Sequence, residues 1–277
     1  MKICIDAGHY GKYNKSPVNP AYYESDMTWK LHNYLKSALQ AYGITVVTTR
    51  PTQAGDLGLE SRGRKAAGCD LFLSLHSNAC GDASVDYPLA CCCVSGKADK
   101  LGQQLANKVH SVMGTRQAGR ILKKRGNNGD WYGVLRGAAS VGVPGILLEH
   151  SFHTNLRAAN WLLNDVNLQR MAQAEADVIA AYYGIKKSAG TSKATSSKKY
   201  RTDWKQGEKV TIANQAQLFA NETATAPSSR LKGGTYYVYD GKICKNGRYR
   251  ITTRAEYCGK TPAGKYVTGY VSIDKMG

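Results

Sequence analysis

The sequence has few acidic residues and no long apolar run. Asp and Glu number 20 against 38 Lys and Arg, so the 277-residue chain has a formal net charge of +18. No stretch approaches the roughly 18 apolar residues that a transmembrane helix needs, and the first residues contain no apolar run of signal-peptide length. We therefore expect a chain that is made in the cytoplasm without a signal peptide and does not insert into a membrane.

The sequence also lacks the paired cysteine spacing of a zinc ribbon, although it contains eight cysteines. Three of them, Cys91 to Cys93, are consecutive and lie in an apolar stretch. Alternate residues of a strand point to opposite faces, so these three thiols cannot converge on one metal ion. We expect reduced, partly buried thiols.

The composition excludes a disordered basic tail, because 42% of the residues are hydrophobic and 21% are charged. The charge is unevenly distributed: residues 1–185 contain 20 basic and 14 acidic side chains, a net charge of +6, whereas residues 186–277 contain 18 and 6, a net charge of +12. The second part is therefore the one expected to bind a polyanion. Nucleic acid, an anionic membrane and an acidic cell-wall polymer all fit the charge.

Residues 186–199 have no large apolar side chain and consist of Ser, Thr, Lys, Gly and Ala. This composition predicts a flexible basic linker between a domain at 1–185 and a second domain at 200–277.

Before the linker, short apolar runs alternate with segments of helical periodicity. The runs cover residues 3–5, 44–47, 71–75 and 146–148, and the helical spacing covers 27–39, 101–113 and 166–179, with the last helix closing at Gly184. This alternation predicts an α/β fold in which helices flank a largely parallel twisted sheet.

After the linker, short strand-like runs are separated by turn dipeptides such as Asp240-Gly241 and Asn246-Gly247. Asp-Gly and Asn-Gly between β-rich runs are strong hairpin signals. Eight of the 18 tyrosines lie in these 78 residues. The pattern predicts a small all-β barrel.

Ionisable side chains follow three of the apolar runs in the first domain. The run at 3–5 leads to His9, the run at 71–75 leads to His76, and the run at 146–148 leads to Glu149. The carboxyl ends of parallel strands border the crevice in which such sheets bind ligands, so we expect the three side chains to converge there.

A fourth group, Glu24, opens the first long helix. Two imidazoles and a carboxylate with one open position are the usual ligands of a catalytic zinc ion, and a further carboxylate such as Glu149 could take a proton from the metal-bound water. The alternative for each residue alone is a hydrogen-bonded structural histidine or a helix-capping glutamate.

Five segments of the first domain resemble the zinc-dependent N-acetylmuramoyl-L-alanine amidases. They are Ile5-Asp6-Ala7-Gly8-His9, Glu24, Val47-Thr48-Thr49-Arg50, Asp70 to Ala79 and Leu147 to Asn155. The segments occur in the family's order and the resemblance covers essentially all of residues 1–185.

The resemblance implies that His9, Glu24 and His76 hold one zinc ion and that Glu149 is the catalytic glutamate. It also implies the reaction, hydrolysis of the amide bond between N-acetylmuramic acid and the L-alanine of the peptidoglycan stem peptide. Two positions depart from the common pattern. Ala7 replaces a frequent Pro, which should not affect the ligands, and His150 replaces the usual Gly beside Glu149, where it could tune the base, contact peptide or pack.

Other residues near the motifs are weaker candidates. Asp6 could support the turn at His9, and Asn78 could order the loop after His76. Trp131, with Arg136 nearby, could stack on a sugar or grip a peptide, or could anchor its own loop. Competing metal ligands are Asp26, His153, His32 and His110; the last two fall in predicted helices and are more simply surface or packing residues.

The second domain resembles, more loosely, the bacterial SH3-like cell-wall-binding modules of endolysins. Teichoic-acid phosphates or stem-peptide carboxylates would be its partners. An amidase with such a module and no export signal resembles a phage or prophage endolysin, which acts on the wall after release from the cytoplasm. Two alternatives are a noncatalytic wall-binding protein and a nucleic-acid-binding protein, but no nucleic-acid recognition motif accompanies the basic residues.

Overall fold

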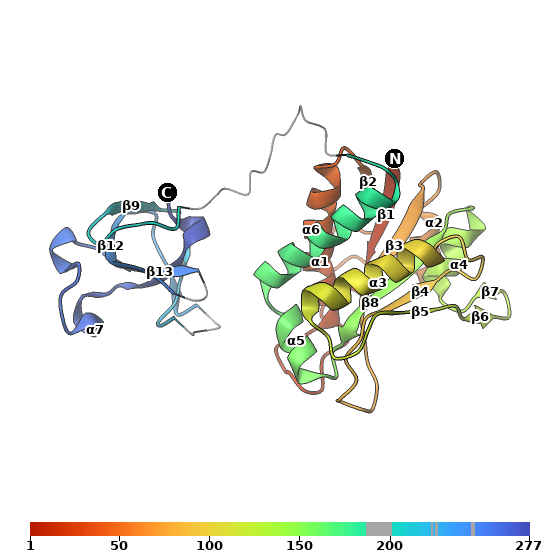
Figure 1. The fold of residues 1–277 in the computed structure, drawn as a ribbon, viewed down its shortest axis with the longest axis horizontal. Helices are drawn as coiled ribbons and strands as arrows, with labels where there is room; N and C mark the ends of the chain where they lie inside the picture. Colours follow the sequence, from red (N-terminus) through yellow and green to blue (C-terminus); the bar gives the residue numbers. More distant parts are fainter. Residues whose placement is uncertain (187–200, 223, 225–226, 245–246) are drawn as a thin grey trace. The chain divides into compact units, whose positions relative to one another are not determined.

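The computed structural model describes residues 1–186, 201–222, 224, 227–244 and 247–277 (Figure 1). The chain divides into two compact units, Met1–Ser192 and Lys193–Gly277. The predicted linker at 186–199 lies, apart from Lys186, outside the described residues.

The N-terminal unit is built on a six-stranded sheet in the order β2-β1-β3-β8-β4-β5. Neighbouring strands are parallel except for β4 and β8, which are antiparallel. The predicted largely parallel sheet is therefore confirmed, with one reversed pairing. The strands are β1 (Lys2–Ala7), β2 (Thr45–Thr48), β3 (Leu71–Asn78), β4 (Leu89–Cys92), β5 (Arg120–Leu122) and β8 (Gly145–Phe152); a separate hairpin pairs β6 (Arg125–Gly126) with β7 (Gly129–Asp130).

Helices cover both faces of this sheet. One face, which forms the larger of the two hydrophobic cores, packs against three long helices: α1 (Glu24–Gln40), α3 (Asp99–Met113) and α6 (Asp165–Tyr182). Two shorter helices, α2 (Leu59–Arg64) and α4 (Gly133–Ser140), pack against each other beside the opposite face, and α5 (Leu156–Leu162) lies next to α6.

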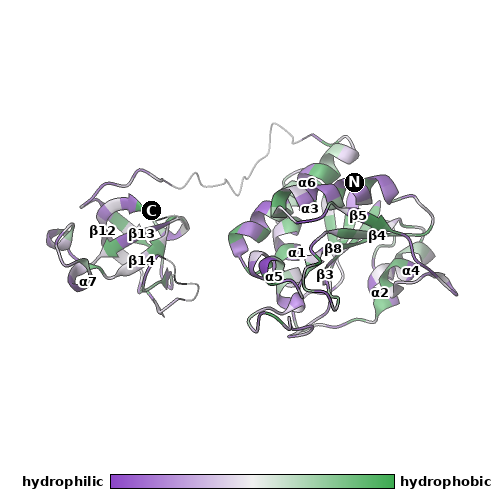
Figure 2. Cartoon of the chain, turned by 60° about the horizontal axis from the view of Figure 1, so that its bottom comes forward, coloured by the Kyte–Doolittle hydropathy of each residue, from purple (hydrophilic) through white to green (hydrophobic). Residues whose placement is uncertain are grey.

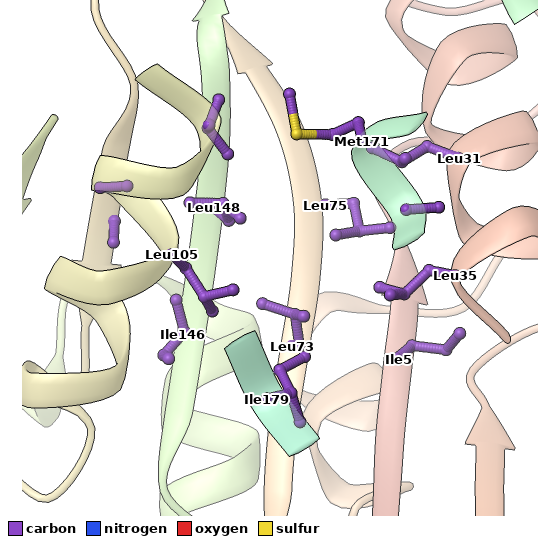
Figure 3. Packing of buried hydrophobic residues seen from close by; sticks show 14 of the residues in the cluster. Ile5, Leu31, Leu35, Leu73, Leu75, Leu105, Ile146, Leu148, Met171 and Ile179 are labelled. Atoms are coloured by element: carbon purple, nitrogen blue, oxygen red, sulfur yellow. The ribbon is translucent and has the colours of Figure 1, made fainter. Parts of the chain in front are cut away.

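Side-chain alternation along the strands produces one core on each face. Leu73 and Leu75 of β3 and Ile146 and Leu148 of β8 point toward α1, α3 and α6 (Figure 3). The intervening Phe72 and Leu147 point to the α4 side. Each fully buried side chain of this size stabilises the fold by about 1.5–3 kcal/mol, so the cores on both faces contribute to the stability of the sheet.

Local signals explain where the later helices begin and end. Asn155 and Asn164 cap α5 and α6, because their side-chain oxygens accept hydrogen bonds from backbone N–H groups of the first turn. Helix α6 ends at Tyr182 and Gly184 follows with a φ of +68°, so the predicted closure is confirmed.

All eight cysteines lie in the described residues and are free. Cys91 and Cys92 belong to the cores on opposite faces of the sheet, as their alternation predicts. Burial raises the pKa of each of these two thiols to about 12, so both stay protonated.

The C-terminal unit is all-β, as predicted. A four-stranded antiparallel sheet has the order β14-β13-β12-β9, and β10 pairs with β11. The strands are β9 (Lys209–Ile212), β10 (Gln217–Leu218), β11 (Ser229–Arg230), β12 (Gly234–Ile243), β13 (Arg248–Thr252) and β14 (Gly269–Ser272), with short helical turns η1 (Ala255–Tyr257), α7 (Ala263–Tyr266) and η2 (Ile273–Lys275). Val238, Ile251 and Val271 are fully buried in its core. Its SH3-like character stays a prediction.

Strand β4 of the N-terminal unit is largely hydrophobic, whereas helices such as α6 carry both hydrophobic and hydrophilic residues (Figure 2). Among the described helices, none has the length and apolar character needed to cross a membrane.

Candidate functional site

The site lies at the carboxyl ends of the parallel strands, on the face of the sheet that packs against α4. Strand β3 pairs in parallel with β8, and in their register His76 is the direct partner of Glu149. Registered residues of parallel neighbours project to the same face. The pairing therefore places the imidazole and the carboxylate side by side.

Glu24, in the first turn of α1, links two histidines. Its Oε2 lies 3.1 Å from Nε2 of His9, and its Oε1 lies 2.9 Å from Nδ1 of His76. One donor atom from each of the three residues lies within 4.8 Å of the other two. The structure thus brings together the three residues that the sequence predicts as ligands.

The carboxylate of Glu24 is held in place from both sides. The backbone N–H of Ser77 donates to Oε1 at 2.9 Å, and the side-chain amide of Asn14 donates to Oε2. Burial alone would raise the pKa of Glu24, but hydrogen bonds and charge from His76 and His9 outweigh burial and lower the pKa. Glu24 is therefore an ionised acceptor in the interior.

Gly8 allows His76 to approach the β1 loop. A Cβ at Gly8 would lie 2.4 Å from Cε1 of His76, closer than any real contact. The next residue, His9, has a φ of +58°, which is uncommon outside glycine and turns its ring toward Glu24. This backbone is shaped around two converging imidazoles.

The donor set fits a metal ion. A buried carboxylate and two imidazoles directed at it form a mixed N and O ligand set of the kind that zinc prefers. In the structure each histidine nitrogen lies within 3.1 Å of a Glu24 oxygen, and a divalent cation would bind these atoms in their deprotonated form. His9, Glu24 and His76 are thus the residues able to hold it.

Glu149 differs from Glu24 in how its carboxylate is satisfied. Its Oε2 is buried and has no hydrogen-bond partner among the described residues. Burial, with the nearby charge of Glu24, raises its pKa well above the ordinary value for a glutamate. A carboxyl group that readily takes up a proton, beside a candidate metal site, is suited to general acid–base chemistry.

Asp6 lies beneath the site and does not join the three-residue group. It accepts hydrogen bonds from the hydroxyls of Thr49, at 2.5 Å, and Ser74, at 2.7 Å, and lies 3.9 Å from the guanidinium of Arg62. Arg62 also donates to the carbonyl of His9 at 3.3 Å. Asp6 thus supports the β1 end through its neighbours.

Two buried arginines in this region were missed by the sequence reasoning. Arg62 contacts the carbonyl of His9, and Arg50 donates to the carbonyl of Ala7 at 3.2 Å. The signal for Arg50 was its place in the motif at residues 47–50. Nothing in the sequence around Arg62 distinguishes it from a surface helix residue.

Three weaker candidates lie outside the three-residue group. Two of them, Trp131 and Arg136, belong to a region in which Asp130 accepts a hydrogen bond from the N–H of Val94, near the start of β8. Asn78 ends β3, where its carbonyl accepts a hydrogen bond from the N–H of His153 at 2.8 Å. Trp131 is 54% exposed, with the ammonium of Lys124 3.9 Å from its ring centroid. Arg136 donates to the carbonyls of Asp130 and Trp131, so it holds the loop that presents the tryptophan.

The competing ligands have other partners. His153 Nδ1 lies 3.9 Å from Glu24 but forms a hydrogen bond with Ser77. The carboxylate of Asp26 accepts a hydrogen bond from the side chain of Gln53. The imidazole of His110 forms a hydrogen bond with the hydroxyl of Thr115. His32 is buried against Trp29. His150 is fully buried and faces Glu175 of α6.

A family model described as N-acetylmuramoyl-L-alanine amidase matches residues 3–181. The chain belongs to this amidase family. The amidase is 30% identical over 194 residues to an endolysin of Bacillus phage SPP1, and the match covers 69% of each chain. It is 28% identical over 188 residues to the N-acetylmuramoyl-L-alanine amidase LytC of Bacillus subtilis; that match covers 65% of the amidase and 35% of LytC.

Solved structures share the fold of the N-terminal unit. The catalytic domain of CwlV, an N-acetylmuramoyl-L-alanine amidase from Bacillus (Paenibacillus) polymyxa, matches with a TM-score of 0.54 at 24% identity, covering 67% of the amidase and 99% of that chain. AmiC2 of Nostoc punctiforme matches with a TM-score of 0.57 at 24% identity, covering 66% and 97%. The expected amidase fold of the catalytic part is therefore confirmed.

Proposed function

We propose that the amidase hydrolyses the bond between N-acetylmuramic acid and the L-alanine of the stem peptide, with His9, Glu24 and His76 holding one zinc ion and Glu149 acting as the catalytic base. The observation that carries the proposal is the register between β3 and β8. It places the carboxylate of Glu149, whose Oε2 has no hydrogen-bond partner in the described part of the chain, beside His76 of the three-residue donor set.

Bound there, zinc would supply a Lewis acid that lowers the pKa of a water molecule and polarises the amide carbonyl. Glu149 accepts the proton of the attacking water, because the strand register holds its carboxylate beside His76. It then gives that proton to the departing amine of L-alanine. Asn14 and Ser77 keep Glu24 oriented through both steps.

The four weaker candidates have supporting roles in this proposal. Trp131 presents an exposed aromatic face for a sugar or peptide, and Arg136 fixes its loop. Asp6 and Asn78 hold the strand ends that bring His9 and His76 to the site.

The C-terminal unit, in our proposal, is an SH3-like module that binds an anionic wall polymer such as teichoic acid. The rings of Tyr257 and Tyr266 lie 5.4 Å apart between centroids. Arg254 lies 5.5 Å from the first ring, and Lys260 and Lys265 lie 5.9 and 5.7 Å from the second. Paired aromatic faces beside several cations fit a polymer that alternates sugar or polyol with phosphate.

The biological role that we propose is that of a phage or prophage endolysin, which is made in the host cytoplasm and degrades peptidoglycan after release. The SPP1 endolysin, whose match extends over 69% of that protein, supports this role. In the two-part arrangement, wall binding raises the local concentration of the catalytic unit at its substrate.

Clearing of purified Gram-positive walls, measured with and without a zinc chelator, tests the proposal. Clearing should stop on zinc removal, return on zinc addition, and release free N-terminal alanine without reducing sugar. Clearing that persists without zinc would exclude the metal site. Wall binding without clearing would favour the noncatalytic alternative, and binding of nucleic acid in preference to walls would favour the other.

A further inference from the structure

The pairing of β3 with β8 contains one extra residue immediately after Glu149. His76 pairs with Glu149, whereas Asn78 pairs with Phe152, so β8 advances three residues where β3 advances two. Within this step Ser151 has a φ of +67°, a left-handed conformation that is uncommon for residues other than glycine. The feature is a β-bulge, a device that redirects side chains and is frequent beside active sites.

One side of the bulge is held by a buried carboxylate. The hydroxyl of Ser151 donates to Oδ1 of Asp86 at 2.7 Å, and Asp86 is fully buried. Two nitrogens of Arg157 donate to the other oxygen of Asp86, at 3.0 and 2.7 Å. The left-handed residue is thus fixed through its side chain.

The other side is held by a buried imidazole. His150 projects toward α6, where its Nε2 lies 2.5 Å from Oε1 of Glu175, and its Nδ1 donates to the carbonyl of His76 at 3.0 Å. The His150 side chain therefore bridges a helix, the bulge and the backbone of a proposed metal ligand.

Stability gives no reason for this pair. His150 and Glu175 are both 0% exposed, and Oε2 of Glu175 has no hydrogen-bond partner among the described residues. Removing two charges from water costs more solvation energy than their attraction usually returns, and an apolar pair of similar volume is often as stable or more stable. The burial of His150 and Glu175 is better explained by the backbone that His150 holds beside His76.

We propose that His150 and Glu175 are positioning residues: they lock the bulge in the register that keeps the carboxylate of Glu149 opposite His76. Neither side chain touches reacting atoms, because His150 projects to the α6 face while Glu149 projects to the face beside α4. The inference rests on the proposed function, since it gives catalytic meaning to the alignment of Glu149 with His76.

The test compares stability, zinc affinity and catalysis in three variants. His150→Leu/Glu175→Leu replaces the pair by apolar groups, and Glu175→Gln keeps the shape but removes the charge. Asp177→Asn is the matched control, because Asp177 lies on the same helix and accepts hydrogen bonds from Tyr42 and Gln173 without reaching β8.

For the double Leu variant we expect an unfolding midpoint at or above that of the wild type. Its kcat on a soluble wall fragment should fall by roughly 10- to 100-fold and its zinc dissociation constant, from chelator competition, should rise by a similar factor. KM should not change, because the pair makes no substrate contact. Glu175→Gln should shift kcat and zinc affinity in the same direction, and Asp177→Asn should shift neither.

Wild-type kcat and zinc affinity in a stable double Leu variant would overturn the proposal. So would activity that merely tracks the unfolding midpoint across the variants, because a structural pair predicts that result. If the double variant does not fold, Glu175→Gln, measured well below its own midpoint, answers the same question. Failure of the proposed function is distinguishable, because wild-type protein would then bind zinc without cleaving walls, and zinc affinity would still report on positioning.

Discussion

The N-terminal unit buries ten acidic, arginine and histidine side chains, whereas in the described part of the C-terminal unit such side chains are at least partly exposed. The ten are Asp6, Glu24, His32, Arg50, Arg62, Asp86, Asp130, His150, His153 and Glu175. In the described part of the second unit, Thr252 is the one buried residue of the polar and charged class. Cations such as Lys260 and Lys265 remain exposed there beside tyrosine rings.

The contrast separates two uses of charge. Buried charge is costly and needs partners, but it stays fixed in orientation and can shift the pKa of a catalytic group. Exposed charge costs little and acts at a distance, although salt screens it. The chemistry of this chain should therefore be sensitive to single buried residues, and its wall binding to the sum of surface residues.

The largest expected effect is the loss of catalysis on substitution of Glu149. Glu149→Gln removes the proposed base and should lower kcat by about 10³-fold or more, within the range for general acid–base catalysis. Zinc content and wall binding should stay unchanged, as measured by metal analysis and wall pull-down. His76→Ala is the companion variant and should lose both zinc and activity. Glu149→Gln with wild-type kcat would break the assignment.

Acid should destabilise the N-terminal unit through His32. Burial, together with the charge of Arg50 and against the opposing charge of Asp6, lowers the pKa of His32 to about 4. Because the unfolded chain binds the proton first, stability is lost as pH falls from about 6.5 to 4, by up to about 3 kcal/mol.

His32→Phe should remove this part of the pH dependence. Denaturant unfolding at pH 7 and pH 4 measures the difference between the variant and the wild type. An equal loss of stability in both proteins on acidification would show that His32 is not the group responsible.

Wall binding should weaken when the aromatic and cationic cluster of the C-terminal unit is reduced. Tyr257→Ala/Tyr266→Ala should raise the dissociation constant for walls by about 10-fold, equal to about 1.4 kcal/mol, and leave kcat on a soluble fragment unchanged. Lys209→Ala/Lys242→Ala is the control, because both lysines are exposed but make none of the ring contacts found in the cluster. Weakening by the lysine variant with none by the tyrosine variant would indicate that net charge alone binds the wall, because only the lysine variant removes positive charge.

The smallest predicted effect is a loss of stability that is confined to one of the two units. Ile251→Val removes one buried methylene from the C-terminal core and should cost about 1 kcal/mol. Calorimetry should show a shift in one unfolding transition only. Ile146→Val should shift the other transition by a similar amount. A common shift of both transitions would mean that the units unfold as one.

Much of the site could be predicted because ionisable residues directly follow the apolar runs that form the parallel strands. His76 and Glu149 each follow an apolar run, and parallel strands bring such positions to one edge. The reversed direction of β4 could not be predicted, because alternation reads the same along either direction of a strand.

The pairing of His150 with Glu175 was also out of reach of the sequence. The two residues are 25 positions apart, and a glutamate within a helical pattern is ordinarily exposed. Only the packing of α6 onto the sheet brings them together. Arg62 likewise could not be predicted, because its burial depends on where α2 lies against Asp6 and His9 at the end of β1.

Because of the bulge after Glu149, the function of the site depends on the number of residues in β8 as well as on their identity. Deleting one residue at 150 or 151 would restore an unbroken ladder and move every later residue of the strand by one position relative to Asn78. Inserting one residue before Glu149 would turn its carboxylate toward the α6 face. Relatives that differ here by a single residue would need a gap at this position before their sequences could be aligned.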